Sequence, residues 1–443
     1  MFIKKYIKIA FSLLKACLNF IIFFPVTVIL IPYFYLKKIR FYQLNYFLGG
    51  STNLKVYLSR KKKQNFVYKD IIFIPDSFNI YYGKRKITNK FWIEKVTEGL
   101  ILVSPKKKLI FVIFNSIIQN IYKVISILRL KRFQVNLDDF LGYFRSSKSD
   151  VENYKSINEP FINFSKNDLI KCDDEFRKIN NFMNINSEQE IITFCNRDGA
   201  YKKYQLPEMD LSYHNFRNFS PDDFIDFAKD FSNKKFFLIR VGNISEKKMN
   251  FNGKNIFDYS QGNYKSDYLD IYLLLKSKFF VGTESGLDKV MNFLRKPIVL
   301  INIQLRSVER EKLKQEKKVS NQISKKKFFQ FTGEDIFFIP QKLYNEKEKR
   351  FYTFTEIANS NVGLIIKDND FKKMGVKVVN NSVDEIRNVS HEMNDFLDRK
   401  LELSDDDFYL QEKFWDIFKN EFFYSENYKI SPSFLRNNKE LLG

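Results

Sequence analysis

The feature that most constrains this chain is a regular alternation, from residue 190 onward, of short apolar runs with amphipathic stretches. Apolar runs of about four to eight residues are typical of buried strands, and apolar residues at helical spacing indicate covering helices. Helix starts are indicated at Ser220, Ser266 and Gly286, the first two by a serine followed by proline or acidic residues. Such alternation predicts a parallel sheet covered by helices. The predicted strands are Ile191–Phe194, Phe236–Val241, Phe279–Val281 and Pro297–Asn302.

The length of 443 residues favours two domains with extensions. Hydrophobic residues make up 44% of the chain, which is the composition of a folded protein. Upstream of residue 188 the pattern is less regular, but β-like runs such as Ile71–Pro75 and Ile101–Val103 predict a first α/β domain. The expected divisions are a membrane anchor at 1–37, an N-terminal α/β domain at 38–187, a C-terminal α/β domain at 188–400 and a helical tail at 401–443.

An uncharged segment, residues 16–36, is long enough to cross a bilayer as a helix. No small-residue cleavage site follows it, so we expect retention as an anchor rather than removal as a signal peptide. Pro25 and Pro32 would kink a spanning helix, which leaves a re-entrant hairpin as the alternative. Basic residues are in excess after the segment and favour a cytoplasmic position for the rest of the chain. A second apolar run, Leu109–Tyr122, predicts either a core helix or an amphipathic helix on anionic lipid.

The formal net charge of +22 suggests an anionic partner: nucleic acid, an acidic lipid surface or a phosphate-bearing substrate. The alternative is a compositional bias toward lysine that has no functional meaning. No zinc-finger spacing or ribonucleoprotein motif is present, so we expect no nucleic-acid partner. The three cysteines lie far apart and only two histidines occur, which predicts neither a disulfide framework nor a metal site.

Polar residues follow three of the predicted strands. Because ligands bind beyond the carboxyl ends of parallel strands, these residues are predicted to share one edge and to bind substrate. The loop from Gly282 to Gly286 opens a predicted helix, whose free N–H groups and positive dipole suit a diphosphate. The candidates at the strand ends are Asn196, Arg197, Asp198, Arg240, Gly242, Glu284, Ser285 and Gly286.

Several of these residues have two interpretations. Arg197 and Arg240 could neutralise the charge of a leaving nucleoside diphosphate without a metal, or they could form ion pairs with Asp198 or Asp258 at the sheet edge. Asp267 could contact a ribose or sugar hydroxyl or contribute to a helix cap. His214 could contact ligand or be an ordinary surface or core histidine.

An ordered series of short motifs resembles a family of bacterial glycosyltransferases associated with surface-polysaccharide synthesis. The resemblance covers about residues 191–393 and is faint upstream, around residues 46–58. A lysine-rich insertion after Asn302 departs from the family pattern. The motifs are FCNRDGAY, HNFRN, FFLIRVG, NIFDYS, SDYLDIYLL, FFVGTESGLDKVMNFLRKPIVLIN, IPQK and FTEI.

This resemblance implies a GT-B-like fold, in which two Rossmann-type domains face each other and the C-terminal one holds the sugar donor. It places Arg197, Arg240, Ser285 and Gly286 on the donor side. The implied activity is transfer of a sugar from a nucleotide-sugar donor to a glycan or lipid-linked acceptor, at the cytoplasmic face of the bacterial inner membrane, without metal or cofactor.

The catalytic base is predicted to be Asp198 or a carboxylate of the first domain such as Asp76. Two other functions stay open. One is a sugar-nucleotide epimerase or hydrolase of the same fold, and the other is a non-catalytic membrane-bound assembly protein.

Overall fold

A computed structural model describes two compact units, residues Met1–Asn158 and Glu159–Gly443. In the second unit it describes residues 162–443 except 184, 187, 208–209, 233–234, 252, 306–334, 366 and 419–427. In the first it describes positions 18, 21–33, 36–43, 48–49, 54, 69–73, 78–79, 83–84, 88–103, 113, 116–117 and 120. Asp76, most of the Leu109–Tyr122 run and most of the lysine-rich insertion lie outside the described residues.

The first unit contains a parallel three-stranded sheet in the order β1-β2-β5. Its β2 and β5 fall on the two β-like runs of the sequence, and a helix, α3, begins where Asn89 accepts a hydrogen bond from the Trp92 N–H (2.8 Å). An α/β architecture in this unit therefore agrees with the sequence. The elements are β1 (Ile39–Gln43), β2 (Lys69–Phe73), β3 (Phe78–Asn79), β4 (Gly83–Lys84), α3 (Lys90–Val96) and β5 (Ile101–Val103).

Residues 21–33 are helical. Among the described residues, however, none of the helices combines the length and the apolar character needed to cross a bilayer.

The second unit is built on a seven-stranded, fully parallel sheet in the order β8-β7-β6-β9-β10-β11-β15. The first strand in the chain, β6, is central, the next two lie outward on one side, and the rest follow on the other. This is the order of a doubly wound nucleotide-binding domain with one further strand. The strands are β6 (Glu190–Cys195), β7 (Phe236–Arg240), β8 (Ile256–Asp258), β9 (Ser277–Gly282), β10 (Ile298–Ile303), β11 (Ile336–Pro340) and β15 (Tyr428–Ile430).

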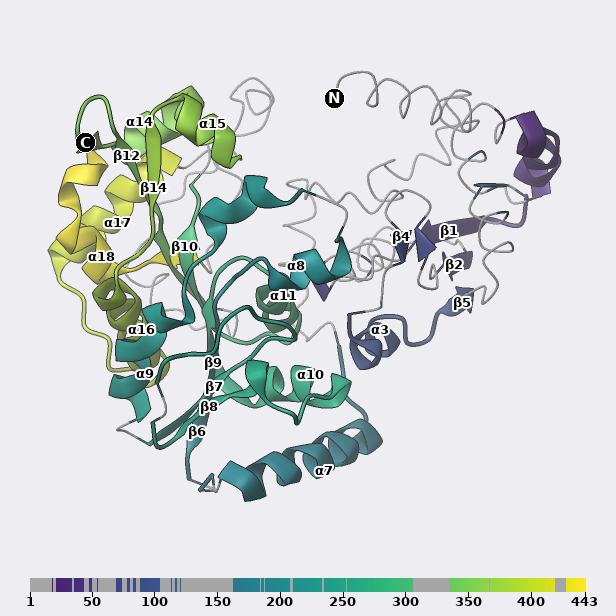
Figure 1. Ribbon diagram of the computed structural model, residues 1–443, viewed down its shortest axis with the longest axis horizontal. Coiled ribbons are helices and arrows are strands. Elements are labelled where there is room, and N and C mark those ends of the chain that lie inside the picture. The colour runs from purple at the N-terminus through teal and green to yellow at the C-terminus, as the bar shows by residue number, and fades with distance from the viewer. Residues whose placement is uncertain are drawn as a thin grey trace. The chain divides into compact units, whose positions relative to one another are not determined.

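The four predicted strands of this sheet are confirmed, because β6, β7, β9 and β10 fall on the expected apolar runs. Every residue of β7 and β10 is buried, as expected for strands covered on both faces. Helices α9 (Ile225–Ser232) and α16 (Val383–Leu397) pack on one face. Helices α7 (Lys166–Met183), α10 (Asp267–Lys276) and α11 (Gly286–Phe293) pack on the other (Figure 1).

The helix starts predicted from capping residues are also found. Ser220 caps the short helix η3 (Pro221–Phe224) that leads into α9, and Ser266 caps α10 by accepting from the Leu269 N–H (3.2 Å). The other elements around the sheet are α8 (Ala200–Gln205), η2 (Ser212–Arg217), η4 (Tyr259–Gln261), α14 (Phe354–Asn359), η5 (Asn361–Leu364) and α15 (Asp368–Lys373).

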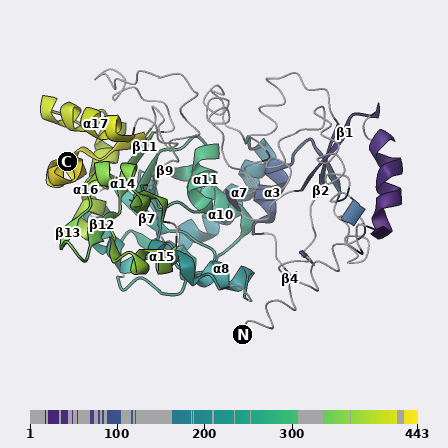
Figure 2. The same cartoon turned by 90° about the horizontal axis from the view of Figure 1, so that it is seen from above.

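Two features differ from the domain divisions expected from sequence. Helix α7 packs on α10, so the second unit starts upstream of residue 188. The segment after residue 400 was expected to be a helical tail, but β15 pairs with β11 and completes the sheet. Among the elements after β11, β12 (Lys342–Asn345), α14 and α17 (Asp405–Phe418) lie toward one end of the unit in both views (Figures 1 and 2). The remaining elements are β13 (Arg350–Phe351), β14 (Val376–Val379), α18 (Pro432–Asn437) and η6 (Lys439–Leu442).

Candidate functional site

The strand order of the second unit reverses between β6 and β9, and their carboxyl ends lie side by side because Cys195 pairs with Gly282. On the other side of β6, Phe194 pairs with Arg240, and Arg240 in turn pairs with Asp258. The loops that follow β6, β7 and β9 therefore meet at one edge, as predicted. In open α/β sheets this reversal is where ligands bind.

The short helix η2 crosses this edge and is fastened to it at three places. Arg197 donates from Nη1 to the carbonyl of His214 (3.1 Å). Arg217 donates from Nη2 to the carbonyl of Glu284 (2.7 Å), and Gln341 donates from Nε2 to the carbonyl of Phe216 (2.9 Å). These contacts tie η2 to the loops after β6, β9 and β11, so its side chains become part of the edge.

Three cations gather where η2 meets the loop after β6, and we call Arg197, Lys202 and Arg217 the cation cluster. Burial lowers the pKa of Arg197 to about 10, and the charge of Arg217 adds to this effect. Burial together with both arginines lowers the pKa of Lys202 to about 8. Among the described residues, no carboxylate forms an ion pair with Lys202. The cluster therefore holds excess positive charge and suits a polyanion.

One carboxylate borders the cluster from the loop after β9. Glu284 Oε2 lies 3.4 Å from Arg217 Nη2, and both side chains are largely buried. Asp198 also acts on the charge of Arg197, so two carboxylates compensate part of the charge of the three cations. Glu284, predicted to bind substrate, is thus placed beside the cations.

The loop after β9 is shaped by a capping box. Ser285 caps α11 by accepting from the Leu287 N–H (3.2 Å), and the Ser285 N–H donates to Asp288 Oδ1 (2.6 Å). Asp288 is fully buried, which raises its pKa, while the nearby Lys289 ammonium opposes that rise. Gly286 is the first residue of α11. The start of this helix is therefore rigid and faces the same edge as the cation cluster.

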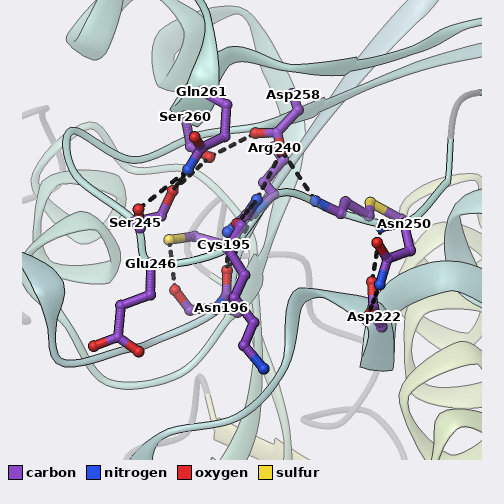
Figure 3. A network of polar contacts seen from close by, with 12 residues as sticks. Cys195, Asn196, Asp222, Arg240, Ser245, Glu246, Asn250, Asp258, Ser260 and Gln261 are labelled. Atoms are coloured by element: carbon purple, nitrogen blue, oxygen red, sulfur yellow. Dashed lines mark hydrogen bonds and ion pairs between the residues drawn. The ribbon is translucent and has the colours of Figure 1, made fainter.

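Arg240 and Asn196 lie deeper and bind each other (Figure 3). Arg240 is only 1% exposed; its Nε and Nη2 donate to Asn196 Oδ1 (3.1 and 2.8 Å), and its Nη1 donates to Asp258 Oδ2 (2.7 Å) and to the Lys247 carbonyl (2.8 Å). Of the two interpretations given for Arg240, the structure shows the ion pair with Asp258. This buried guanidinium joins three loops.

Asp198 is occupied by main-chain donors. Its Oδ1 accepts from the Ala200 N–H (3.0 Å) and its Oδ2 from the Glu246 N–H (2.9 Å). The carboxylate therefore fixes two loops to each other. Gly242 has a φ of +144°, a conformation that favours glycine at the end of β7.

The last two predicted contacts lie near this edge. His214 lies in η2, with its ring centroid 4.1 Å from that of Tyr213. Asp267 is the first residue of α10, after the capping Ser266. One turn further along α10, the carboxylate of Asp270 accepts a hydrogen bond from the Tyr259 hydroxyl (2.7 Å). The Asp270 side chain therefore has a structural role.

Sequence reasoning did not single out Lys202, Arg217, Asn218 or Glu246. Arg217 and Asn218 stand inside the HNFRN motif, which was the available signal for them. Within the part of the chain that the structure describes, no group of three or more His, Cys, Asp or Glu residues could hold a metal ion.

The sequence matches no protein-family model, and a search of curated proteins finds no match. Among solved structures, a family 9 glycosyl transferase from Veillonella parvula aligns over 59% of this chain and 80% of its own, with 11% identity and a TM-score of 0.34. ADP-heptose LPS heptosyltransferase II from E. coli aligns over 59% and 84%, again with 11% identity and a TM-score of 0.34. UDP-GlcNAc 2-epimerase from Neisseria meningitidis aligns over 62% and 84%, with 11% identity and a TM-score of 0.26. These low values identify neither a substrate nor a reaction.

Proposed function

We propose that this chain is a glycosyltransferase that moves a sugar from a nucleotide-sugar donor to a lipid-linked or surface-polysaccharide acceptor. The observation that carries the proposal is the cation cluster at the reversal point of the sheet. Three cations held together where doubly wound domains bind ligands fit a polyanionic group such as a nucleoside diphosphate. The start of α11 adds main-chain N–H donors and a helix dipole at the same edge.

In the proposed reaction, the acceptor hydroxyl oxygen bonds to the anomeric carbon of the sugar while the bond from that carbon to the diphosphate oxygen breaks. The electron pair of the broken bond leaves with the nucleoside diphosphate, whose negative charge grows in the transition state. Cations positioned before the reaction stabilise this developing charge. We assign that role to Arg197, Lys202 and Arg217; a divalent cation supplies the same stabilisation in other enzymes.

The acceptor proton must pass to a base. Both oxygens of Asp198 accept main-chain N–H groups, so we propose that Asp198 shapes the site. The other candidate that the sequence offers for the base, Asp76, stays a prediction because it lies outside the described residues.

The proposed location is the bacterial inner membrane, with the chain after the anchor segment on the cytoplasmic side. Its support is the sequence alone: the uncharged residues 16–36 and the excess of basic residues after them. A lipid-linked acceptor carries its reactive end at such a surface.

The test is the binding of UDP-, GDP-, CDP- and ADP-sugars to the full chain by calorimetry. Arg217→Ala is expected to lose donor binding, since it removes one of three cations. Arg177→Ala is the matched control: this arginine is 69% exposed on α7 and, among the described residues, its ion pair is with Asp174, so its loss should leave binding unchanged. Absence of binding for every donor tested would overturn the proposal.

The donor that binds is then incubated with and without acceptor glycans. Transfer requires an acceptor for product to form. Product in the absence of acceptor would instead support the epimerase or hydrolase alternative.

A further inference from the structure

Next to the cation cluster, a bare glycine lies between two polar side chains. A Cβ built on Gly199 would lie 3.3 Å from Glu246 Oε1 and 3.9 Å from Asn218 Nδ2. Gly199 has φ −82° and ψ −16°, which any residue can adopt, so its backbone conformation does not require glycine. The distance of 3.3 Å is tighter than an ordinary contact, so the missing side chain is what lets the Glu246 carboxylate lie this close to the Gly199 main chain.

Glu246 belongs to a loop that is fixed along its length. Its N–H donates to Asp198 Oδ2 (2.9 Å), and the next residue, Lys247, accepts from Arg240 Nη1 (2.8 Å). Asn250 donates twice to Asp222, from its main chain (2.9 Å) and from Nδ2 (2.7 Å). These contacts hold the Glu246 backbone in place without using its side chain.

The carboxylate of Glu246 points away from the polar network around Arg240 (Figure 3). In the described part of the chain it accepts no hydrogen bond and forms no ion pair, although cations lie on neighbouring elements. The loop sets the position of the Glu246 main chain, the side chain is exposed, and its two oxygens keep their capacity to accept hydrogen bonds from a ligand.

Asn218 connects this place to the cation cluster. Its Oδ1 accepts from Arg197 Nη1 (2.8 Å), and its Nδ2 donates to Asn215 Oδ1 (3.2 Å). An amide nitrogen carries two N–H groups, so one remains to donate to a ligand. A carboxylate acceptor and an amide donor on either side of Gly199 match hydroxyl groups, which both donate and accept.

The topology suggests which hydroxyls these are. In dinucleotide-binding domains of doubly wound topology, an acidic residue about 20 positions beyond the first strand–helix turn hydrogen-bonds a ribose hydroxyl. By chain order β7 is the second strand of this sheet, and Glu246 follows its last residue, Arg240, by six positions. Resting on the proposed function, we infer that Glu246 and Asn218 bind neighbouring hydroxyl groups of the donor, those of the ribose in the first place, and that a side chain at Gly199 would crowd Glu246.

The test measures the affinity of the full chain for UDP, GDP, CDP and ADP by calorimetry. The nucleoside diphosphate that binds is then compared with its 2′,3′-dideoxy form and with inorganic diphosphate. Glu246→Ala should weaken binding of the nucleoside diphosphate about 10-fold to 100-fold, as expected for hydrogen bonds to a charged group. The affinities of Glu246→Ala for the dideoxy analogue and for inorganic diphosphate should equal those of the unchanged chain. Glu402→Ala, at an exposed carboxylate before α17, is the control and should change nothing.

Gly199→Ala is a second, independent variant. Its helical φ and ψ suit alanine, so the melting temperature should stay equal or rise while nucleotide affinity falls. The added methyl group would crowd Glu246 Oε1, at 3.3 Å, and not the Arg240 network. A loss of affinity with unchanged melting temperature is therefore not a loss of folding.

The outcomes are distinct. If Glu246→Ala weakens only nucleotide sugars and not nucleoside diphosphates, the hydroxyls belong to the sugar and the subsite stands. If both variants bind nucleoside diphosphates and nucleotide sugars like the unchanged chain, the subsite is refuted and the proposed function remains. If the unchanged chain binds none of them, the proposed function fails and the subsite with it.

Discussion

Arg217 of η2 and Glu284 of the loop after β9 are joined twice, through the Glu284 carbonyl (2.7 Å) and through its carboxylate (3.4 Å). The first contact orients the guanidinium, and the second balances part of its charge. Because the carbonyl belongs to the backbone, the link survives any change of the Glu284 side chain. This link places the Arg217 guanidinium, near the end of the long loop region 196–219, beside the start of α11.

Loss of this link should lower stability as well as binding. Arg217→Met removes a charged hydrogen bond whose donor is only 16% exposed, and the free energy of unfolding should fall by about 1–2 kcal/mol. Urea denaturation of the full chain measures this. Arg177→Met, at an exposed site, should stay within about 0.5 kcal/mol of the unchanged chain. Equal effects of the two substitutions would contradict the structural role of Arg217.

Donor binding should depend on the protonation of Lys202. Its pKa of about 8 reflects burial first and then the charges of Arg197 and Arg217. A bound polyanion favours the ammonium form, so affinity should be greatest below pH 8 and should fall as pH rises past that value. Calorimetry between about pH 6.5 and about pH 9.5 measures the decline. Lys202→Arg keeps its charge over this range and should remove the decline attributable to this site.

The same residue should make the free chain less stable at neutral pH. The folded pKa lies below that of an unfolded lysine, about 10.4, so the unfolded chain binds more protons between these two values. The free energy of unfolding should therefore rise with pH across this window. Below pH 8 the folded chain bears the full destabilisation that comes from holding Lys202 charged in a buried place. Lys202→Met should stabilise the ligand-free chain at neutral pH and remove that rise. Urea denaturation of the ligand-free chain at several pH values tests this. If Lys202→Met were less stable than the unchanged chain at neutral pH, the Lys202 charge would not be destabilising.

Arg240 should matter for folding rather than for direct contact with the donor. Arg240→Met leaves Asp258 and the Asn196 amide without their buried partner, and breaking such a pair costs about 3 kcal/mol or more. Urea denaturation should show this loss, and Arg240→Lys should recover part of it. Full stability combined with lost donor binding would instead show that Arg240 reaches the ligand.

Gly242 should tolerate no side chain, unlike Gly199. Its φ of +144° is strained for any other residue, although the space around its Cβ position is ordinary, with Ser260 Cβ at 3.6 Å. Gly242→Ala should therefore lower stability by about 1–3 kcal/mol through backbone strain. Thermal unfolding of Gly242→Ala beside Gly199→Ala compares two glycines that differ chiefly in φ. Equal melting temperatures for both variants would refute the strain.

The sheet of the second unit could be predicted because its central strands are uninterrupted apolar runs. The strand β15 could not, since it is three residues long and contains Lys429. That lysine is buried and its ammonium lies 2.7 Å from Asp335 Oδ1, so a contact 94 positions away makes the strand possible. No local pattern encodes such compensation.

The site was predictable in its position and less so in its members. Strand ends gave Arg197, Asp198, Glu284 and Ser285, because loops after parallel strands must meet at one edge. Which side chains are available to a ligand depends on the path that the segments between the strands take across this edge. The path of η2 across the edge brings in Arg217, and the pinned loop after β7 brings in Glu246 while using both oxygens of Asp198. Spacing along the chain does not reveal either path.

The pairing of β11 with β15 also has a consequence for synthesis. Ile336 and Tyr428 are neighbours in the sheet, yet more than ninety residues of chain must be made between them. Until then the outer edge of β11 offers unpaired main-chain groups and buried-type side chains to any other strand that meets it. If synthesis stalls before residue 428, the edge of β11 can pair with a wrong strand. This hazard ends when the three residues of β15 are made and pair with β11.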